Sequence, residues 1–331
     1  MKYSHKKLIA LAVILVVALA FPFFIGNVYY LHIAIEAYIN VILGMGFALL
    51  YSVGLITLGM AAYYGIGAYA STLLVMKSGL SFWLAMPAAG IIAGIVAAVI
   101  GLLIVRYPGV GFVVFTLVTG FVMQRIWGAV RLFGGWGGII GIPPPNPIFG
   151  VVDFSSKIHY YYLSLFLLLV TVVVLYGLYQ SRIGRAWRAI KLDPRLAATT
   201  GINAYVYRLA AFVVACAFAG LAGSFYAHYS GTIMPDAFDL HKSIHIQIYA
   251  ILGGLESYIL GPLTGAIVFT AVPEFLRMAP EIEPYFTGCL LIGLVIFLPS
   301  GLAGLAQRVP GLLSQLYAAC MHQSGASEHS R

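Results

Sequence analysis

Charged residues are scarce in this chain. Of 331 residues, only 18 are lysine or arginine and 10 are aspartate or glutamate, together 8% of the sequence. Soluble domains carry about 25% charged residues, so the composition excludes a soluble enzyme. Disordered segments are poor in apolar residues, whereas 62% of this chain is hydrophobic. Together with its long apolar runs, the composition predicts an all-α, polytopic integral membrane protein.

The sequence also lacks the motifs of most catalytic and metal sites. Its three cysteines are scattered and form no CxxC pair, and no phosphate-binding loop, GxSxG elbow or HExxH sequence occurs. We therefore predict no catalytic residue, no metal and no cofactor bound by the chain itself, and no nucleic-acid partner. His241 and His245 leave an intramembrane metalloenzyme open as an alternative, although no third ligand is evident.

Apolar runs predict eight to ten membrane spans. They lie at about 8–25, 33–53, 55–76, 82–105, 109–131, 160–180, 206–228, 244–275 and 284–299. The run at 244–275 is interrupted by glycines and Pro262, so it is either two half-helices or one span with a re-entrant piece. Cleavage of a signal peptide near Ala20 is an alternative for the first run.

The basic residues predict the orientation. With residues 1–7 in the cytoplasm, the segment 181–205, which holds the densest basic cluster, also falls in the cytoplasm. The segment 132–159, rich in glycine and proline, falls outside, as a stiff connector or the rim of an entry mouth. These segments lie within a transmembrane domain at 8–300, and a tail at 301–331 is placed in the cytoplasm.

Few charged residues lie within the predicted spans. Glu36 is attributed to a membrane interface, Arg125 lies deep in its span, and Glu256 lies in the broken region. There is no relay of acidic residues of the kind that proton-driven pumps use. This sparse lining favours the passage of a small solute that is neutral overall, and it argues against an ion-gradient-driven secondary transporter, which stays open as an alternative.

The basic cytoplasmic segment is punctuated as two short helices. A basic helix at 185–191 is followed by Asp193 as a helix N-cap, by Pro194 at the first helical position, and by Gly201 as the residue that ends the second helix. The segment is either an amphipathic element held by anionic lipid or a docking knob for a cytoplasmic partner.

Four stretches of the sequence resemble those of a known family. Gly184 to Gly201 resembles the coupling loop of ABC importer permeases. Three further stretches, at 58–69, 134–143 and 252–274, resemble branched-chain amino acid ABC transporter permeases, in particular the longer of the two paired permease subunits. The resemblance covers about residues 38–300.

The resemblance implies the partners of the chain and the roles of its residues. It implies a subunit of an inner-membrane importer that pairs with a second permease, two cytoplasmic ATPases that bind ATP and Mg²⁺, and a periplasmic substrate-binding protein, all in contact with membrane lipid. Residues expected to couple to the ATPases are Gly184, Arg185, Arg188, Asp193, Ala197 and Gly201. Residues expected along the substrate pathway are Tyr63, Tyr64, Gly65, Gly253, Gly254 and Glu256.

The sequence departs from the family pattern at four positions. The family usually has two acidic residues after the basic helix, whereas this chain has only Asp193. Thr199 stands where glutamate is frequent in the family. Met60 stands where histidine or glutamine is frequent. Glu256 replaces a small residue after Gly-Gly-Leu and bears on the polarity of the pathway. Urea or short amides therefore stay open as alternative substrates, and pairing as a homodimer or a heterodimer stays open too.

Overall fold

The structure is a computed structural model, and it describes residues 18–22, 27–147, 154, 156–255 and 257–276, together with the single residues 288, 292 and 301. The predicted spans at 8–25 and 284–299 therefore lie mostly outside the described residues. The predicted cytoplasmic segments 1–7 and, apart from Gly301, 301–331 lie outside them as well.

Nearly all of the described chain is helical, as predicted for an all-α protein. The longer helices are α2 (Val28–Tyr51), α3 (Met60–Ser78), α4 (Phe82–Ile104), α5 (Val110–Ala129), α6 (Lys157–Gln180) and α9 (Ala204–Ser230). The shorter ones are α7 (Arg182–Leu192), α8 (Pro194–Thr199), α10 (Leu240–Gly253) and α11 (Leu260–Leu276). Three-residue and four-residue 3₁₀ helices occur at η1 (Arg131–Phe133), η2 (Gly135–Gly137) and η3 (Pro235–Phe238).

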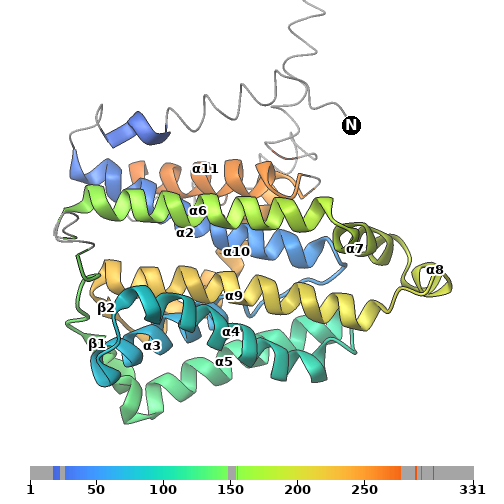
Figure 1. The fold of residues 1–331 in the computed structure, drawn as a ribbon, viewed down its shortest axis with the longest axis horizontal. Coiled ribbons are helices and arrows are strands. Elements are labelled where there is room, and N and C mark those ends of the chain that lie inside the picture. The colour runs from blue at the N-terminus through green and yellow to red at the C-terminus, as the bar shows by residue number, and fades with distance from the viewer. Residues whose placement is uncertain are drawn as a thin grey trace, which may run out of the picture.

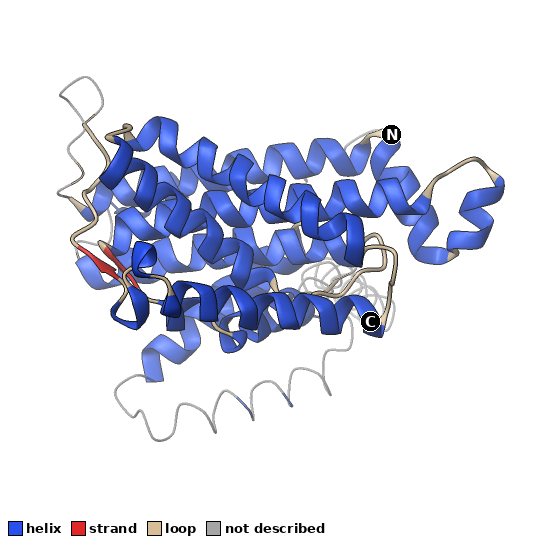
Figure 2. Cartoon of the chain, turned by 90° about the horizontal axis from the view of Figure 1, so that it is seen from below, coloured by secondary structure: helices blue, strands red, loops and turns tan. Residues whose placement is uncertain are grey.

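The long helices lie side by side along one axis (Figure 1). Helices α7 and α8 project at one end, here called the loop end. The strands β1 (Ile139–Ile140) and β2 (Thr232–Ile233) pair antiparallel at the opposite end, here called the hairpin end (Figure 2). Among the described residues, α2, α4, α5, α6 and α9 are long and apolar enough to cross a membrane. A multi-pass membrane protein follows from this arrangement.

The segment predicted to span at 55–76 becomes helical only at Met60. Residues 55–59 are irregular, and side chains of α5 and α10 satisfy two of their backbone groups. Leu58 N donates to Thr116 Oγ1 of α5 at 3.1 Å, and the Gln247 side chain of α10 donates to Thr57 O at 2.8 Å. Irregular backbone survives at membrane depth only where protein or a water-filled cavity covers it, and these two contacts supply such cover.

Helices α3 and α9 run parallel in direct backbone contact. A Cβ atom on Gly67 would collide with the backbone of Gly220, and one on Gly223 would collide with the carbonyl of Tyr64. Further along the same contact, Ser224 Oγ donates to Ser71 Oγ at 2.7 Å. Small residues let helix backbones approach closely in lipid, where packing and interhelical hydrogen bonds drive association.

The contact between α3 and α9 predicts the effect of replacing one of its glycines by a larger residue. Gly223→Val should destabilise the protein by about 1–3 kcal/mol, because the obstructing atoms are backbone atoms that cannot move aside cheaply. The measurement is the thermal unfolding midpoint in mild detergent. Gly177→Val on α6, where a Cβ would meet nothing within 4 Å, is the matched control. Equal midpoints for the two variants would contradict the prediction.

Candidate functional site

The loop end has the helix–turn–helix form that its sequence predicts. Asp193 caps α8, accepting from Arg195 N at 2.8 Å and from Leu196 N at 3.2 Å. Pro194 occupies the first turn of α8. Gly201 follows the helix at φ = 80°, a left-handed conformation that suits glycine. The first helix begins earlier than predicted, at Arg182, because Ser181 caps it through Ile183 N.

Side chains fix this loop to the membrane bundle. Trp187 is buried, and its Nε1 donates to Tyr207 O of α9 at 3.0 Å. Arg188 Nη1 donates to Tyr179 O of α6 at 3.1 Å. Gly184 is buried so closely against Tyr179 that a Cβ atom would not fit. The loop therefore moves with α6 and α9 and is not a free tether.

The far side of the loop presents leucine to solvent. Leu192 is 88% exposed and Leu196 is 67% exposed, on either side of Asp193. Arg185 and Arg188 are also exposed, whereas Ala197 is buried. Sequence reasoning missed both leucines. The capped turn between them is predictable from the sequence, but their exposure depends on how the loop packs against α6 and α9.

The residues predicted to line the pathway are largely packed. Tyr63, Tyr64 and Gly65 are buried, and the Tyr63 ring meets the Phe212 ring edge-on at 5.3 Å. Within the described part of the chain, the Tyr63 hydroxyl has no hydrogen-bond partner. Contact of these residues with a solute stays a prediction.

The broken region at 244–275 consists of two helices joined by a turn. Gly253 packs against Gly261, and Gly254 opens the turn at φ = 105°. Glu256, predicted to line the pathway, lies outside the described residues. With 14 residues, α10 is about 21 Å long, which is shorter than the roughly 30 Å hydrocarbon core of a bilayer.

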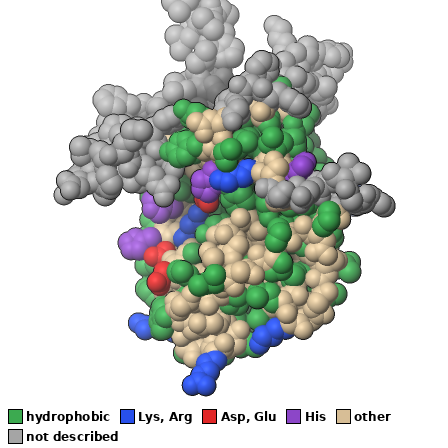
Figure 3. Space-filling model, turned by 90° about the vertical axis from the view of Figure 1, so that its left-hand side faces the viewer, with side chains coloured by type: hydrophobic (Ala, Val, Ile, Leu, Met, Phe, Trp, Pro, Cys, Tyr) green, Lys and Arg blue, Asp and Glu red, His purple; other side chains and the backbone are tan. Residues whose placement is uncertain are grey.

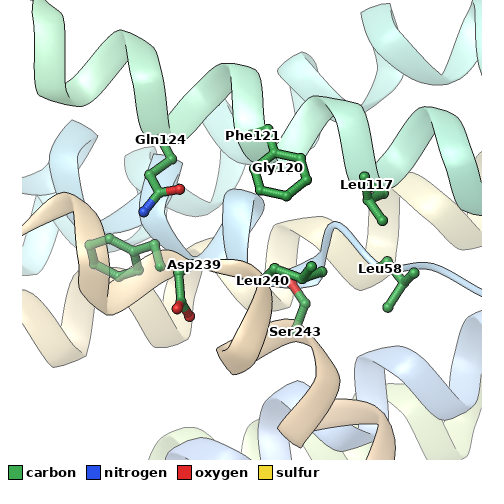
Figure 4. A pocket seen from close by; sticks show the side chains of 9 residues that line it. Leu58, Leu117, Gly120, Phe121, Gln124, Asp239, Leu240 and Ser243 are labelled. Atoms are coloured by element: carbon green, nitrogen blue, oxygen red, sulfur yellow. The ribbon is translucent and has the colours of Figure 1, made fainter.

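The start of α10 lies at mid-depth. Lys242 Nζ donates at 3.0 Å to the side chain of Asn40, which stands in the middle of α2. A small pocket adjoins this start, between α5, the irregular residues before α3 and the first turn of α10 (Figure 4). It is lined by Leu58, Leu117, Gly120, Phe121, Gln124, Phe238, Asp239, Leu240 and Ser243.

His241 and His245 are exposed on α10. No group of three potential metal ligands forms among the described residues. In the part of the chain that the structure describes, the mid-depth start of α10 and the anchored loop are thus two features with functional potential.

Comparison with known proteins gives the family. A family described as "Branched-chain amino acid transport system / permease component" matches residues 29–299, most of the chain. The chain belongs to this family. The match covers every α-helix from α3 to α11 and all but the first residue of α2.

Curated relatives cover most of this permease. It is 29% identical to the high-affinity branched-chain amino acid transport system permease protein LivM of Salmonella typhimurium and to LivM of Escherichia coli. Each alignment covers 90% of this chain and 75% of the relative. It is also 29% identical to a probable branched-chain amino acid transport permease protein LivH of Methanocaldococcus jannaschii, over 78% of this chain and 83% of the relative. No solved structure matches the permease.

The buried hydroxyl of Tyr63 generates a prediction about stability. Tyr63→Phe should leave the unfolding midpoint unchanged or raised, because no hydrogen bond is lost. Tyr63→Ala should cost about 3–5 kcal/mol, since it removes a buried ring. Tyr160→Phe is the matched control. Its hydroxyl donates to His228 O at 2.9 Å, so that variant should lose about 1 kcal/mol. A larger loss for Tyr63→Phe than for Tyr160→Phe would refute the packing assignment.

Proposed function

We propose that this chain is a permease subunit of an ABC importer that moves branched-chain amino acids across a bacterial inner membrane. Its partners are a second permease, two cytoplasmic ATPases and a periplasmic binding protein. The chain performs no chemistry itself, and ATP and Mg²⁺ act on the ATPases. Family membership and the names of the relatives support this transport class.

One structural observation supports coupling to an ATPase. The loop end offers two exposed leucines, Leu192 and Leu196, beside the exposed Arg185. Apolar side chains surrounded by charge are typical of a protein interface, where they fill pockets of the partner. A helix held only by anionic lipid would need no rigid attachment through Trp187 and Arg188.

The proposed mechanism is a rigid-body switch. Closure of the ATPases on ATP displaces α7 and α8, and the attachment to α6 and α9 carries that displacement into the bundle. Two states of the bundle, open to either side, differ in their affinity for the closed ATPases, and this difference drives the change. Four loop residues act by maintaining the folded conformation of α7, α8 and the turn between them. They are Gly184, Arg188, Asp193 and Gly201.

The alternatives differ in what they require. A urea or short-amide permease would use the same loop with a pathway suited to uncharged solutes. A gradient-driven transporter would need no ATPase, and it would leave the exposed leucines without a role.

A double substitution tests the coupling proposal. Leu192→Asp with Leu196→Asp should abolish co-purification of the ATPase subunits from mild detergent and reduce ATP-driven leucine uptake to background. The reason is that the two introduced carboxylates would be buried in the apolar contact proposed between the loop and the ATPase. Leu132→Asp, at an exposed leucine of η1 near the hairpin end, is the matched control and should retain both activities.

The same experiment separates the alternatives. Uptake of leucine by membranes that hold this chain alone would favour the gradient-driven transporter. Retention of the ATPase by the double variant would overturn the role assigned to the two leucines. Uptake of urea and not leucine by the intact complex would keep the ABC assignment and change the substrate.

A further inference from the structure

Three polar side chains form a stripe along α2. His32, Glu36 and Asn40 follow one another at intervals of four residues, a spacing that places them on one face of a helix. His32 Nδ1 and the Tyr229 hydroxyl of α9 are joined by a hydrogen bond of 2.6 Å. Because Asn40 bonds to Lys242 of α10 and to Thr270 of α11, the stripe faces α9, α10 and α11. Glu36 is thus partly buried in the bundle, and its place at a membrane interface stays a prediction.

Lys242 retains hydrogen-bonding capacity. An ammonium group has three donors, and among the described residues Lys242 Nζ makes one hydrogen bond, to Asn40 Oδ1. The ammonium also lies 5.9 Å from the centre of the Tyr64 ring. Two donors of a cation at mid-depth are therefore available to another acceptor.

Glu36 has no direct partner among the described residues. Within the described part of the chain, its carboxylate makes no hydrogen bond and no ion pair. It nevertheless interacts electrostatically with Lys242, and with the side chains of Tyr64, Tyr226 and Tyr229. Lys242 also interacts electrostatically with Asp239, the N-cap of α10, so carboxyl groups of α2 and of the start of α10 both lie near its ammonium group.

Such an arrangement is costly without a ligand. Ionisable residues inside a membrane protein normally pair with one another or mark the path of a solute. Here Lys242 bonds to Asn40, which lies one helical turn from Glu36 on the same face of α2, yet among the described residues Lys242 and Glu36 make no direct contact. On the hairpin-end face, acidic, basic and histidine side chains gather along one side, next to the residues drawn in grey (Figure 3).

We propose that Glu36 and Lys242 form a binding site for the zwitterionic backbone of an α-amino acid. Lys242 receives the carboxylate of the solute, and Glu36 receives its ammonium group. A zwitterion supplies both missing partners at once and adds no net charge, so a neutral amide or urea would satisfy neither group fully. This inference rests on the proposed function, because it assigns the recognition step of the same transport.

The surrounding side chains suit such a solute. The rings of Tyr64 and Tyr226 lie 5.5 Å apart beside the charged pair, and the Tyr64 ring also meets Phe238 at 5.3 Å. Aromatic walls accommodate an aliphatic side chain while the charges hold the backbone, which is the usual division between apolar and polar contacts in a ligand pocket. The charged groups therefore recognise the backbone that all α-amino acids share, and the aromatic rings contact the side chain that differs between them.

Substrate analogues test the site through its charges. The complete complex of permease and ATPases, purified without binding protein, is tested for binding of radiolabelled leucine, with two competitors. Leucinol lacks the carboxylate, and 4-methyl-2-oxopentanoate lacks the ammonium group. Wild type should prefer leucine to either analogue by about tenfold or more, because each analogue leaves one buried charge unpaired.

Each variant should lose its preference for leucine over one of the two analogues and keep its preference over the other. Lys242→Met should bind leucinol about as well as leucine while still rejecting the keto acid, and Glu36→Gln should show the opposite pattern. Lys77→Met, at the exposed end of α3, is the matched control and should behave as wild type. Co-purification of the ATPases shows that each variant assembles, so a merely structural role would lower binding of all three compounds together.

The outcomes separate this inference from the proposed function. Unchanged discrimination in both variants would overturn the zwitterion site, and so would a uniform loss of binding. The zwitterion site would also be overturned if a wild-type complex that transports leucine bound no leucine at this site. Failure of the wild-type complex to assemble with ATPases or to transport any branched-chain amino acid would overturn the proposed function instead.

Discussion

Hydrogen bonds from α5 and α10 to the irregular backbone before α3 and to the first turn of α3 hold the centre of this permease together. The Thr116 hydroxyl accepts from Leu58 N, the Ser243 hydroxyl accepts from Ala61 N at 3.1 Å, and Gln247 donates to Thr57 O. Lipid offers no substitute for such partners, and an unsatisfied peptide group there costs several kcal/mol. Two interrupted elements, the irregular residues before α3 and the start of α10, are consequently fixed to each other at mid-depth.

This fixed centre explains why charge can be tolerated inside the bundle. Because α10 begins at mid-depth, Lys242 lies beside Asn40, opposite the polar stripe of α2. A continuous helix at this position would bring a different set of side chains to the same depth. The broken helix therefore positions polar chemistry without exposing it to lipid, an arrangement familiar from transporters whose half-helices meet at the membrane centre.

Much of this fold can be predicted from the sequence, and the failures are informative. Apolar run length predicts α2 to α6 and α9 to within a few residues, and Asp193, Pro194 and Gly201 predict the loop end, because caps and turns are local effects. The irregular residues 55–59 are not predictable in this way, since Thr57 and Leu58 depend on side chains more than fifty residues away. The stripe of His32, Glu36 and Asn40 was readable as a spacing of four. Its direction, however, depends on which helix packs against it. The two loop leucines, Leu192 and Leu196, could be identified only from their exposure in the structure, because no local sequence pattern reveals it.

The loop end is joined to α10 through a stack of aromatic rings and one cation. Tyr258, in the turn after α10, stacks on Tyr179 of α6 at 4.7 Å between ring centres, and Lys191 of α7 lies over Tyr51 at 3.8 Å and near Tyr258 at 5.8 Å. Helix α10 runs for 14 residues, about 21 Å, from the turn that holds Lys242 to the turn that leads to Tyr258. The same short helix thus has its first turn against the polar stripe of α2 and its last turn next to the aromatic contacts of the loop end.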